Sequence, residues 1–350
     1  MSRQLALNAV HLRPNPRPAH TEYSVMNYHH ELLARVIPNY SRSREDIRQF
    51  LQLWDIDFLF NTDDCIAWTK LGRTTDMGHA DYAADGSDRR EPKPCPFTDV
   101  EEVYAFDPAR EYGRQTHAEL VSYYRNSFTS RQDFFADQLC TGGYYKTVIS
   151  GCIQAFGWDM LLLAAADAER FAEVLRRFGR YTLHYVQAQA ESPCEVFIQH
   201  DDFVWTSGPF MHPAIYREVI IPLYADMWRV LHQAGKKVLF CSDGTYTMFM
   251  PDLARAGADG FIFEPSNDFA WVVGQYGRTH CLVGSAVDCR TMTFGTWEQV
   301  QAEIDATLAL APQCAGLIWS VGNHMPPNIP ADICQKYIDY LKQHWSTTAR

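Results

Sequence analysis

The second half of the chain repeats one unit, in which a short apolar strand is followed by a longer amphipathic helix. At least five such units fit between residues 195 and 345, and their predicted strands are Glu195–Gln199, Lys236–Phe240, Gly260–Phe263, His280–Val283 and Gly316–Ser320. Nearly continuous apolar strands that alternate with helices are typical of parallel sheets with right-handed crossovers. No G-x-G-x-x-G follows a strand, which disfavours a dinucleotide-binding sheet, so the 350 residues fit an α/β fold of the (β/α)8 TIM-barrel type best.

Capping residues indicate where the helices of this barrel begin. Ser43 with Asp46, and Thr296 with Gln299, match the capping-box pattern, and Pro213 is well placed to open a helix. Further helices are predicted over residues 116–136, 168–189 and 330–345.

The organisation predicted from these elements is a single barrel domain over residues 43–350, with an N-terminal extension over residues 1–42. The extension is polar and carries three prolines between residues 14 and 18. Residues 70–114 are rich in Gly, Asp, Pro and Arg and predict a long loop insertion. A loop of that length usually covers a functional site.

Composition disfavours several classes of partner. The formal net charge is -11 at pH 7, so a generally acidic surface argues against nucleic acid and against anionic membranes. The longest apolar run, Met160–Ala166, is too short to cross a bilayer. The 10 cysteines form no C-x-x-C pair, which argues against a disulfide framework or a zinc ribbon. We therefore expect a cytoplasmic protein with reduced thiols.

Polar side chains follow the predicted strands at their carboxyl ends. In a barrel these ends meet at one mouth, where catalytic residues gather. The residues expected there as catalytic are Asp63, Asp202, Asp243, Glu264 and His324, and those expected to bind substrate include His200, Asp201 and Asp288. Each carboxylate alone could equally cap a turn or a helix, but repetition at successive strand ends favours a site.

A zinc site is a further hypothesis for this mouth. Cys241, Glu264 and His324 are suitable ligand types on nearly successive strand ends. The alternative is that Cys241 is a small buried thiol, which is the commoner environment of cysteine. No compact ligand motif decides between the two interpretations.

Two segments of the second half carry a recognisable succession of motifs. They read GPFMHPAIYREVIIPLYADMWRVLHQAGKKVLFCSDG and LARAGADGFIFEP. A third segment, residues 320–340, reads SVGNHMPPNIPADICQKYIDY. This succession resembles the uroporphyrinogen decarboxylase superfamily, which includes corrinoid-dependent methyltransferases that act on methanol, methylamines, methyl halides or aryl methyl ethers. The resemblance covers roughly residues 195–345 and implies a (β/α)8 barrel.

The methyltransferase branch of this superfamily uses zinc to activate a thiol through a His-x-Cys motif. That position reads Phe240-Cys241-Ser242 here, so both ligands are missing in register, while Glu264 stands where an acidic ligand would lie. The resemblance implies methyl transfer to or from a corrinoid. No D-x-H-x-x-G motif is present, so a separate partner protein would carry that corrinoid. A reorganised zinc site that includes Cys241, Glu264 and His324 stays open.

The decarboxylase branch needs no cofactor and holds a polycarboxylate macrocycle through N-terminal arginines. Its R-Q-A-G-R-Y-L-P-E-Y segment is similar to Glu31–Tyr40, in which Arg35 matches one arginine and Glu31 replaces another. Asp63 resembles the family Asp that binds pyrrole N–H groups, and His324 resembles the His after the last strand. A carboxylate in place of an arginine disfavours a polyanionic substrate.

Three functions follow as alternatives. The first is methyl transfer to or from a corrinoid on a carrier protein. The second is cofactor-free decarboxylation of a tetrapyrrole or smaller acid, with Asp63 and Arg35 holding the substrate. The third is non-catalytic binding of a tetrapyrrole or of a corrinoid-bearing partner, for which Trp205 and Tyr246 would offer aromatic surface at the mouth. The family also implies a possible homodimer.

Overall fold

The strands of the second half form where the sequence predicts them. In the computed structural model they are β5 (Val196–His200), β6 (Lys237–Cys241), β7 (Gly260–Ile262), β8 (Cys281–Val283) and β10 (Gly316–Trp319). Earlier in the chain lie β1 (Ala19–His20), β2 (Phe58–Leu59), β3 (Leu139–Cys140) and β4 (Gly142–Tyr144), and two short strands, β9 (Val287–Asp288) and β11 (Val321–Gly322), pair with each other. The structure describes residues 2–23, 25–64, 72–78, 89–91, 93–284 and 286–348.

The strands close into a barrel. Seven of them form one parallel sheet in the order β1-β10-β8-β7-β6-β5-β4, and β2 pairs in parallel with β3. Asp57, just before β2, completes the ring. Its N–H donates to the carbonyl of His20 in β1 over 2.8 Å, and its carbonyl accepts from Leu139 in β3 over 2.8 Å. The predicted α/β barrel is therefore confirmed.

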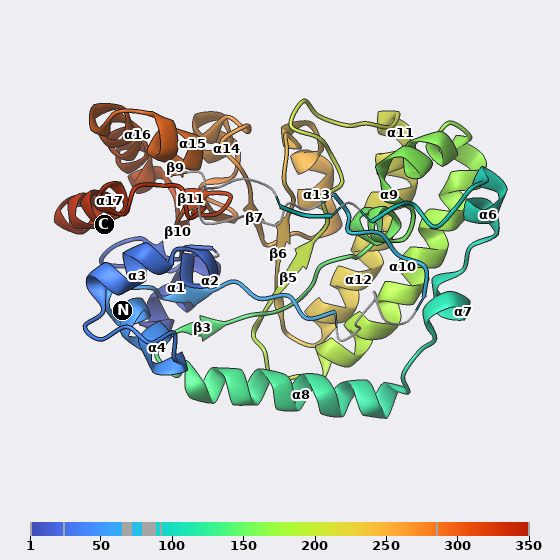
Figure 1. Ribbon diagram of the computed structural model, residues 1–350, viewed down its shortest axis with the longest axis horizontal. Helices are drawn as coiled ribbons and strands as arrows, with labels where there is room; N and C mark the ends of the chain where they lie inside the picture. The colour runs from blue at the N-terminus through green and yellow to red at the C-terminus, as the bar shows by residue number, and fades with distance from the viewer. Residues whose placement is uncertain are drawn as a thin grey trace.

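Helices connect the strands and surround them (Figure 1). Those of the first half are α1 (Arg3–Val10), α2 (Val25–Tyr28), α3 (His30–Val36), α4 (Arg44–Leu53), α6 (Val100–Ala105), α7 (Pro108–Tyr112), α8 (His117–Phe134), α9 (Ile149–Ala165) and α10 (Ala168–Ala190). Those of the second half are α11 (Pro213–Ile215), a π-helical turn (Tyr216–Ile220), α12 (Ile221–Gln233), α13 (Met250–Ala256), α14 (Phe269–Tyr276), α15 (Cys289–Phe294), α16 (Trp297–Leu310) and α17 (Ala331–His344). None of the helices in the described ranges is both long and apolar enough to span a lipid bilayer.

The helix boundaries follow the capping signals. Ser43 and Thr296 each form the predicted capping box, with Asp46 and Gln299 as reciprocal partners. These side chains satisfy backbone N–H groups that the first helical turn leaves without partners, which contributes about 1 kcal/mol per cap. Gly257 ends α13 with a φ of 114°, a conformation that costs glycine least.

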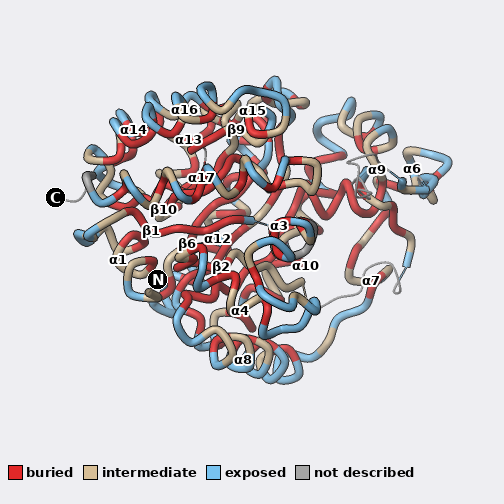
Figure 2. Tube along the Cα trace, turned by 60° about the vertical axis from the view of Figure 1, so that its left-hand side comes forward, coloured by how far each residue is buried: buried red, intermediate tan, exposed pale blue. Residues whose placement is uncertain are grey.

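The interior of the barrel is closed at the amino ends of its strands by α1. Ala6, Ala9 and Val10 of this helix pack into one apolar cluster with inward-facing residues of the strands, including Ile198 and Ile318. Figure 2 shows the buried strands running through the molecule with exposed residues on the outer helices. Because α1 fills one end, any cavity among the strands must open at their carboxyl ends.

Two sequence predictions are corrected by this arrangement. Residues 1–42 are not an extension outside the barrel, because they supply α1, α3 and strand β1, whose Ala19 pairs with Ile318 of β10. The loop predicted over residues 70–114 contains α6 and α7, whose N-caps Asp99 and Asp107 each accept a backbone N–H. Residues 70, 71, 79–88 and 92 of that prediction lie outside the described residues.

A buried polar cluster fastens the seam between β1 and the last strands. This seam cluster consists of His20, Glu22, Trp319 and Tyr337. The Tyr337 hydroxyl donates to Glu22 Oε1 over 2.6 Å, and Trp319 Nε1 donates to that hydroxyl over 2.9 Å. His20 Nε2 lies 3.0 Å from Glu22 Oε1, and the Val321 N–H donates to Glu22 Oε2 over 3.1 Å. One carboxylate thus joins β1, β10, β11 and α17.

Candidate active site

A cavity of about 500 Å³ opens at the carboxyl ends of the strands. Its lining combines titratable groups with aromatic rings: Asp202, Asp243, Glu264, His200, His324, Tyr23, Phe60, Tyr145 and Phe263. None of the described residues that line it is a lysine or an arginine. The mouth of the barrel is therefore rich in carboxylates, and no lysine or arginine among its described lining residues offsets them.

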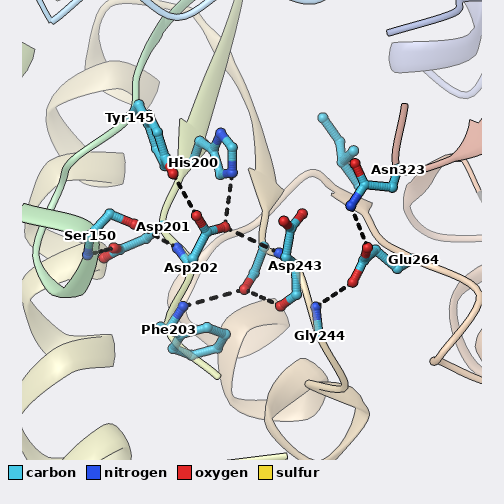
Figure 3. A network of polar contacts seen from close by, with 12 residues as sticks. Tyr145, Ser150, His200, Asp201, Asp202, Phe203, Asp243, Gly244, Glu264 and Asn323 are labelled. Carbon is cyan, nitrogen blue, oxygen red and sulfur yellow. Dashed lines mark hydrogen bonds and ion pairs between the residues drawn. The ribbon is translucent and has the colours of Figure 1, made fainter. Parts of the chain in front are cut away.

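An ion pair at the end of β5 forms one side of the cavity (Figure 3). His200 Nε2 lies 3.0 Å from Asp202 Oδ1, and the Tyr145 hydroxyl donates to Asp202 Oδ2 over 2.6 Å. The Tyr145 ring stacks on the His200 imidazole with centroids 4.1 Å apart. Each oxygen of Asp202 is thereby engaged, and its orientation is fixed from two directions.

Asp201 has a different role from its neighbour, because its side chain is fully buried at the start of α9. Its carboxylate accepts the backbone N–H groups of Val148, Ile149 and Ser150 and the hydroxyl of Tyr224. The Ser150 hydroxyl in turn accepts the N–H of Asp202 over 2.7 Å. Asp201 therefore anchors α9 and, through Ser150, the backbone that carries Asp202.

Asp243 faces Asp202 from the turn after β6. Its N–H donates to Asp202 Oδ1 over 3.3 Å, and the next residue, Gly244, has a φ of 78°. A Cβ at Gly244 would lie 2.5 Å from the Trp205 carbonyl oxygen, so this tight turn requires glycine. The Asp243 carboxylate accepts no hydrogen bond from the part of the chain that the structure describes (Figure 3). It is the acid of the cavity that is free to meet a ligand.

The electrostatic surroundings shift the pKa values of Asp202 and Asp243 in opposite directions. Burial raises the pKa of Asp243, the charges of Asp202 and Glu264 raise it further, and the result is about 8. Burial also acts to raise the pKa of Asp202, but the charge and hydrogen bond of His200 and the hydroxyl of Tyr145 outweigh it, so this pKa is well below its ordinary value. Burial lowers the pKa of His200, yet Asp202 more than compensates and the pKa is raised. These shifts favour an ionised Asp202, the protonated form of His200 and the protonated form of Asp243.

A second set of contacts forms the opposite wall of the cavity. Glu264 Oε2 accepts the Gly244 N–H over 2.6 Å, and Glu264 Oε1 accepts the side-chain amide of Asn323 over 2.6 Å. Asn323 Oδ1 lies 2.6 Å from His324 Nδ1. Burial lowers the pKa of His324, so its ring is neutral at pH 7. We refer to Glu264, Asn323 and His324 as the shared wall.

The structure tests the zinc hypothesis on its donor atoms. Cys241, Glu264 and His324 line the same cavity, but their ligand atoms do not gather into a metal-binding group. Burial and the nearby carboxylates raise the pKa of the Cys241 thiol well above its ordinary value, so without a bound cation the thiol stays protonated. These residues do not fit a thiol-activating zinc site. The ligand atoms that do lie within 4.8 Å of one another belong to His200, Asp202 and Asp243.

His200, Asp202 and Asp243 could hold a cation only after a change of protonation. Metal ligation requires a neutral imidazole, whereas the raised pKa of His200 favours the protonated ring. The His200 nitrogen that would ligate a metal already faces Asp202 over 3.0 Å. The cluster in its observed arrangement is suited to moving a proton.

Half of the 12 sequence-predicted site residues meet in the cavity. Six of them line it: His200, Asp202, Cys241, Asp243, Glu264 and His324. Asp201 lies behind it as an anchor of α9, and Asp288 lines a neighbouring cavity as the N-cap of α15. Polar residues at successive strand ends thus line one cavity, and their roles there stay predictions.

Four predicted residues are placed away from the cavity. Arg35 lies on the exposed surface of α3, and Asp63 accepts hydrogen bonds from Tyr123 and Ser127 of α8. Tyr246 is fully buried and donates to the Ile262 carbonyl, so it is a core residue and not part of the mouth. Trp205 packs near Trp158 and Phe210 and does not line the cavity.

Sequence reasoning missed Tyr145 and Asn323. Tyr145 follows β4, a strand of only three residues that begins with two glycines and has little apolar pattern. Its position directly after a strand is the signal that could have found it. Asn323 lies after the last predicted strand, beside His324, and an amide side chain alone gives no catalytic signal in the sequence. Asn323 has a φ of 66°, a sparsely populated conformation that aims its amide at Glu264.

Comparisons with known proteins agree with this architecture. A family model described as uroporphyrinogen decarboxylase (URO-D) matches residues 149–344, and no curated protein matches the chain. Among solved structures, a methyltransferase from Methanosarcina mazei has a TM-score of 0.64 at 15% identity, covering 97% of this chain and 97% of that one. A D-psicose 3-epimerase has a TM-score of 0.38 at 8% identity, covering 71% of this chain and 87% of that one. The methyltransferase likeness shows a shared fold, and the epimerase likeness carries no argument.

Proposed function

The chain belongs to the uroporphyrinogen decarboxylase family, and on this premise we propose that it is a methyltransferase. In this proposal it moves a methyl group between a small uncharged substrate and a corrinoid held by a separate carrier protein. The observation that carries the proposal is the pair Asp202 and Asp243, whose pKa values are driven apart inside a carboxylate-rich cavity. Such a pair supports an acid and a base of distinct roles at one pH.

The charge of the cavity weighs against a polycarboxylate substrate. Asp202, Asp243 and Glu264 would repel substrate carboxylates, and the described lining offers no lysine or arginine to offset that repulsion. Arg35, the residue expected to hold carboxylates, lies elsewhere on α3. A neutral substrate avoids this repulsion, and the aromatic rings of Tyr23, Phe60 and Phe263 provide apolar surface for it.

Asp243 is the proton donor in this mechanism. When a methyl group leaves an oxygen or nitrogen atom as a cation equivalent, the electron pair of the broken bond stays on that heteroatom. Asp243, protonated at neutral pH, donates its proton to the heteroatom and becomes a carboxylate. A reduced corrinoid supplies the nucleophile for the methyl carbon when it is bound.

Asp202 and His200 keep Asp243 ready for this step. Asp202 stays ionised, and its negative charge helps to hold the proton on Asp243. The His200 ion pair and the Tyr145 hydroxyl hold the Asp202 carboxylate in one orientation, so that its negative charge stays beside the Asp243 carboxyl group. Glu264 adds a second negative charge from the shared wall.

The proposal is tested by mixing the purified protein with cob(I)alamin and, separately, methanol or an aryl methyl ether. Methylcobalamin formed from at least one uncharged donor, followed by its absorbance spectrum, would support the proposal. Asp243→Asn should slow the reaction by about 10²–10⁴-fold, while Asp226→Asn, on an exposed turn of α12, should leave it unchanged. Inactivity with every donor, together with turnover of a tetrapyrrole carboxylate, would overturn it.

A further inference from the structure

The shared wall lies between two cavities, and its three side chains are joined by hydrogen bonds. Glu264, Asn323 and His324 line both the first cavity and a neighbouring one of about 300 Å³. Figure 3 shows the two bonds to Glu264, one from the Gly244 N–H to Oε2 and one from the Asn323 amide to Oε1, each over 2.6 Å. The third link joins Asn323 Oδ1 to His324 Nδ1 over 2.6 Å. The polar atoms of this wall therefore order one another.

Glu264 decides the direction of every bond in this series. Its carboxylate oxygens accept hydrogen bonds, so Asn323 must turn its NH2 group toward Glu264. The amide oxygen of Asn323 then faces His324, and an amide oxygen can only accept. Nδ1 of His324 must therefore carry a proton for the 2.6 Å contact to be a hydrogen bond.

The tautomer determines what His324 offers to a ligand. Burial lowers the pKa of His324, which favours the neutral ring. A neutral imidazole carries one N–H, and the hydrogen bond at one nitrogen fixes the state of the other. With the proton on Nδ1, Nε2 carries a lone pair. His324 is half-buried and lines both cavities, so it meets a ligand there as a hydrogen-bond acceptor.

We propose that Glu264 is a positioning residue, which acts through Asn323 to hold His324 as a hydrogen-bond acceptor. The first cavity then presents a proton donor, Asp243, and an acceptor, His324. The substrate class that follows is a methyl donor that also carries an uncharged O–H or N–H group. This substrate class rests on the proposed function, whereas the tautomer of His324 does not.

The first test is ¹⁵N NMR of the full-length protein labelled at histidine, in which protonated and bare ring nitrogens give separate signals. His324→Gln assigns the signals of this ring. We expect the wild-type proton on Nδ1. In Glu264→Gln the new amide keeps its oxygen for the Gly244 N–H and turns its NH2 toward Asn323. The Asn323 amide then rotates, its NH2 faces Nδ1, and the proton moves to Nε2.

A proton on Nε2 in the wild type, or an unchanged tautomer in folded Glu264→Gln, would overturn the proposal. Asn323→Gly removes the amide and leaves the charge of Glu264 in place. Glycine also suits the φ of 66° at this position. The His324 proton should then exchange between both nitrogens, and a proton that stays on Nδ1 would contradict the role of Asn323. Glu218→Gln, exposed on the π-helical turn, is the matched control and should change nothing.

The second test is calorimetric titration with 3-methoxyaniline and 3-methylanisole. These probes have the same shape, and only the first carries an uncharged N–H donor. We expect the wild type to bind the aniline about tenfold more tightly, as one hydrogen bond would give, and Glu264→Gln to lose this preference. Equal wild-type affinities, or failure of both probes to bind, would reject the substrate class. The expected tautomers and preference in a protein without methyl transfer would support the inference while contradicting the proposed function.

Discussion

The same set of polar groups occurs twice in this barrel with opposite consequences. In the seam cluster, His20 lies 3.0 Å from Glu22, and Tyr337 donates to that carboxylate over 2.6 Å. In the cavity, His200 lies 3.0 Å from Asp202, and Tyr145 donates to that carboxylate over 2.6 Å. A histidine, a carboxylate and a tyrosine at the same distances thus serve two regions of the molecule.

The difference lies in what surrounds each set. The seam cluster is sealed, and the Val321 N–H and the Trp319 indole complete its hydrogen bonds. The cavity set faces open space and a further carboxylate, Asp243, which accepts no hydrogen bond from the described chain. A complete network stabilises the fold, whereas a network with one free acid beside it can exchange a proton with a ligand.

The largest expected effect is the loss of catalysis in Asp243→Asn. Because the amide has no proton to donate at neutral pH, we expect methyl transfer to fall by about 10²–10⁴-fold. Steady-state rates with a donor that supports methyl transfer in the wild-type protein provide the measurement, and Asp226→Asn is the control. A variant that keeps more than half of the activity would show that Asp243 is not the proton donor.

The seam cluster should respond in stability where the cavity responds in rate. In Glu22→Gln the side-chain amide replaces one acceptor oxygen, so a buried donor loses its partner and the cost is about 2–4 kcal/mol. Chemical denaturation followed by circular dichroism measures this free energy of unfolding. We expect the folded variant to retain its rate. Unchanged stability with lost activity would reverse the assignment of the two regions.

The pH profile sharpens the comparison within the cavity. Since Asp243 must be protonated to act and its pKa is raised to about 8, the rate should fall as pH rises through about 8. Asp202→Asn removes the larger repulsive charge on Asp243, so its pKa should decrease and the alkaline limb should move to lower pH. Rates measured between pH 5 and 10 test this direction. A limb that stays in place would mean that another group titrates.

The smallest expected effect is a difference in stability between variants of the two tyrosines, Tyr337 and Tyr145. Tyr337→Phe leaves Glu22 and Trp319 short of a partner and should lower the free energy of unfolding by about 1–2 kcal/mol. Tyr145→Phe should cost less stability, because solvent in the cavity can replace the lost donor to Asp202. Parallel denaturation curves of the two variants make the comparison. Equal losses would indicate that the cavity is as sealed as the seam.

The sequence was informative where local signals agree with the final structure. Capping boxes at Ser43 and Thr296 and the apolar strands of the second half predicted elements that the structure confirms. Strand β1 was not predicted, because two residues are too few to show an apolar pattern. Its pairing with β10 depends on tertiary contacts alone. Asp202 and Asp243 were predicted as site residues from their strand ends. Their division into a charged and a protonated acid depends on burial and distance, which no sequence pattern encodes.

The closure of the barrel also constrains when this protein can finish folding. Glu22 and Val321, which meet across the seam, are 299 residues apart in the chain. During synthesis β1 emerges long before β10, so the edge of β1 that pairs with β10 stays open while almost the whole chain is made. Contacts of such long range form late because closing a large loop costs chain entropy before any pairing repays it. Ribosome-bound nascent chains that end before residue 316 should therefore expose an open sheet edge, and this is the stage at which a chaperone has most to protect.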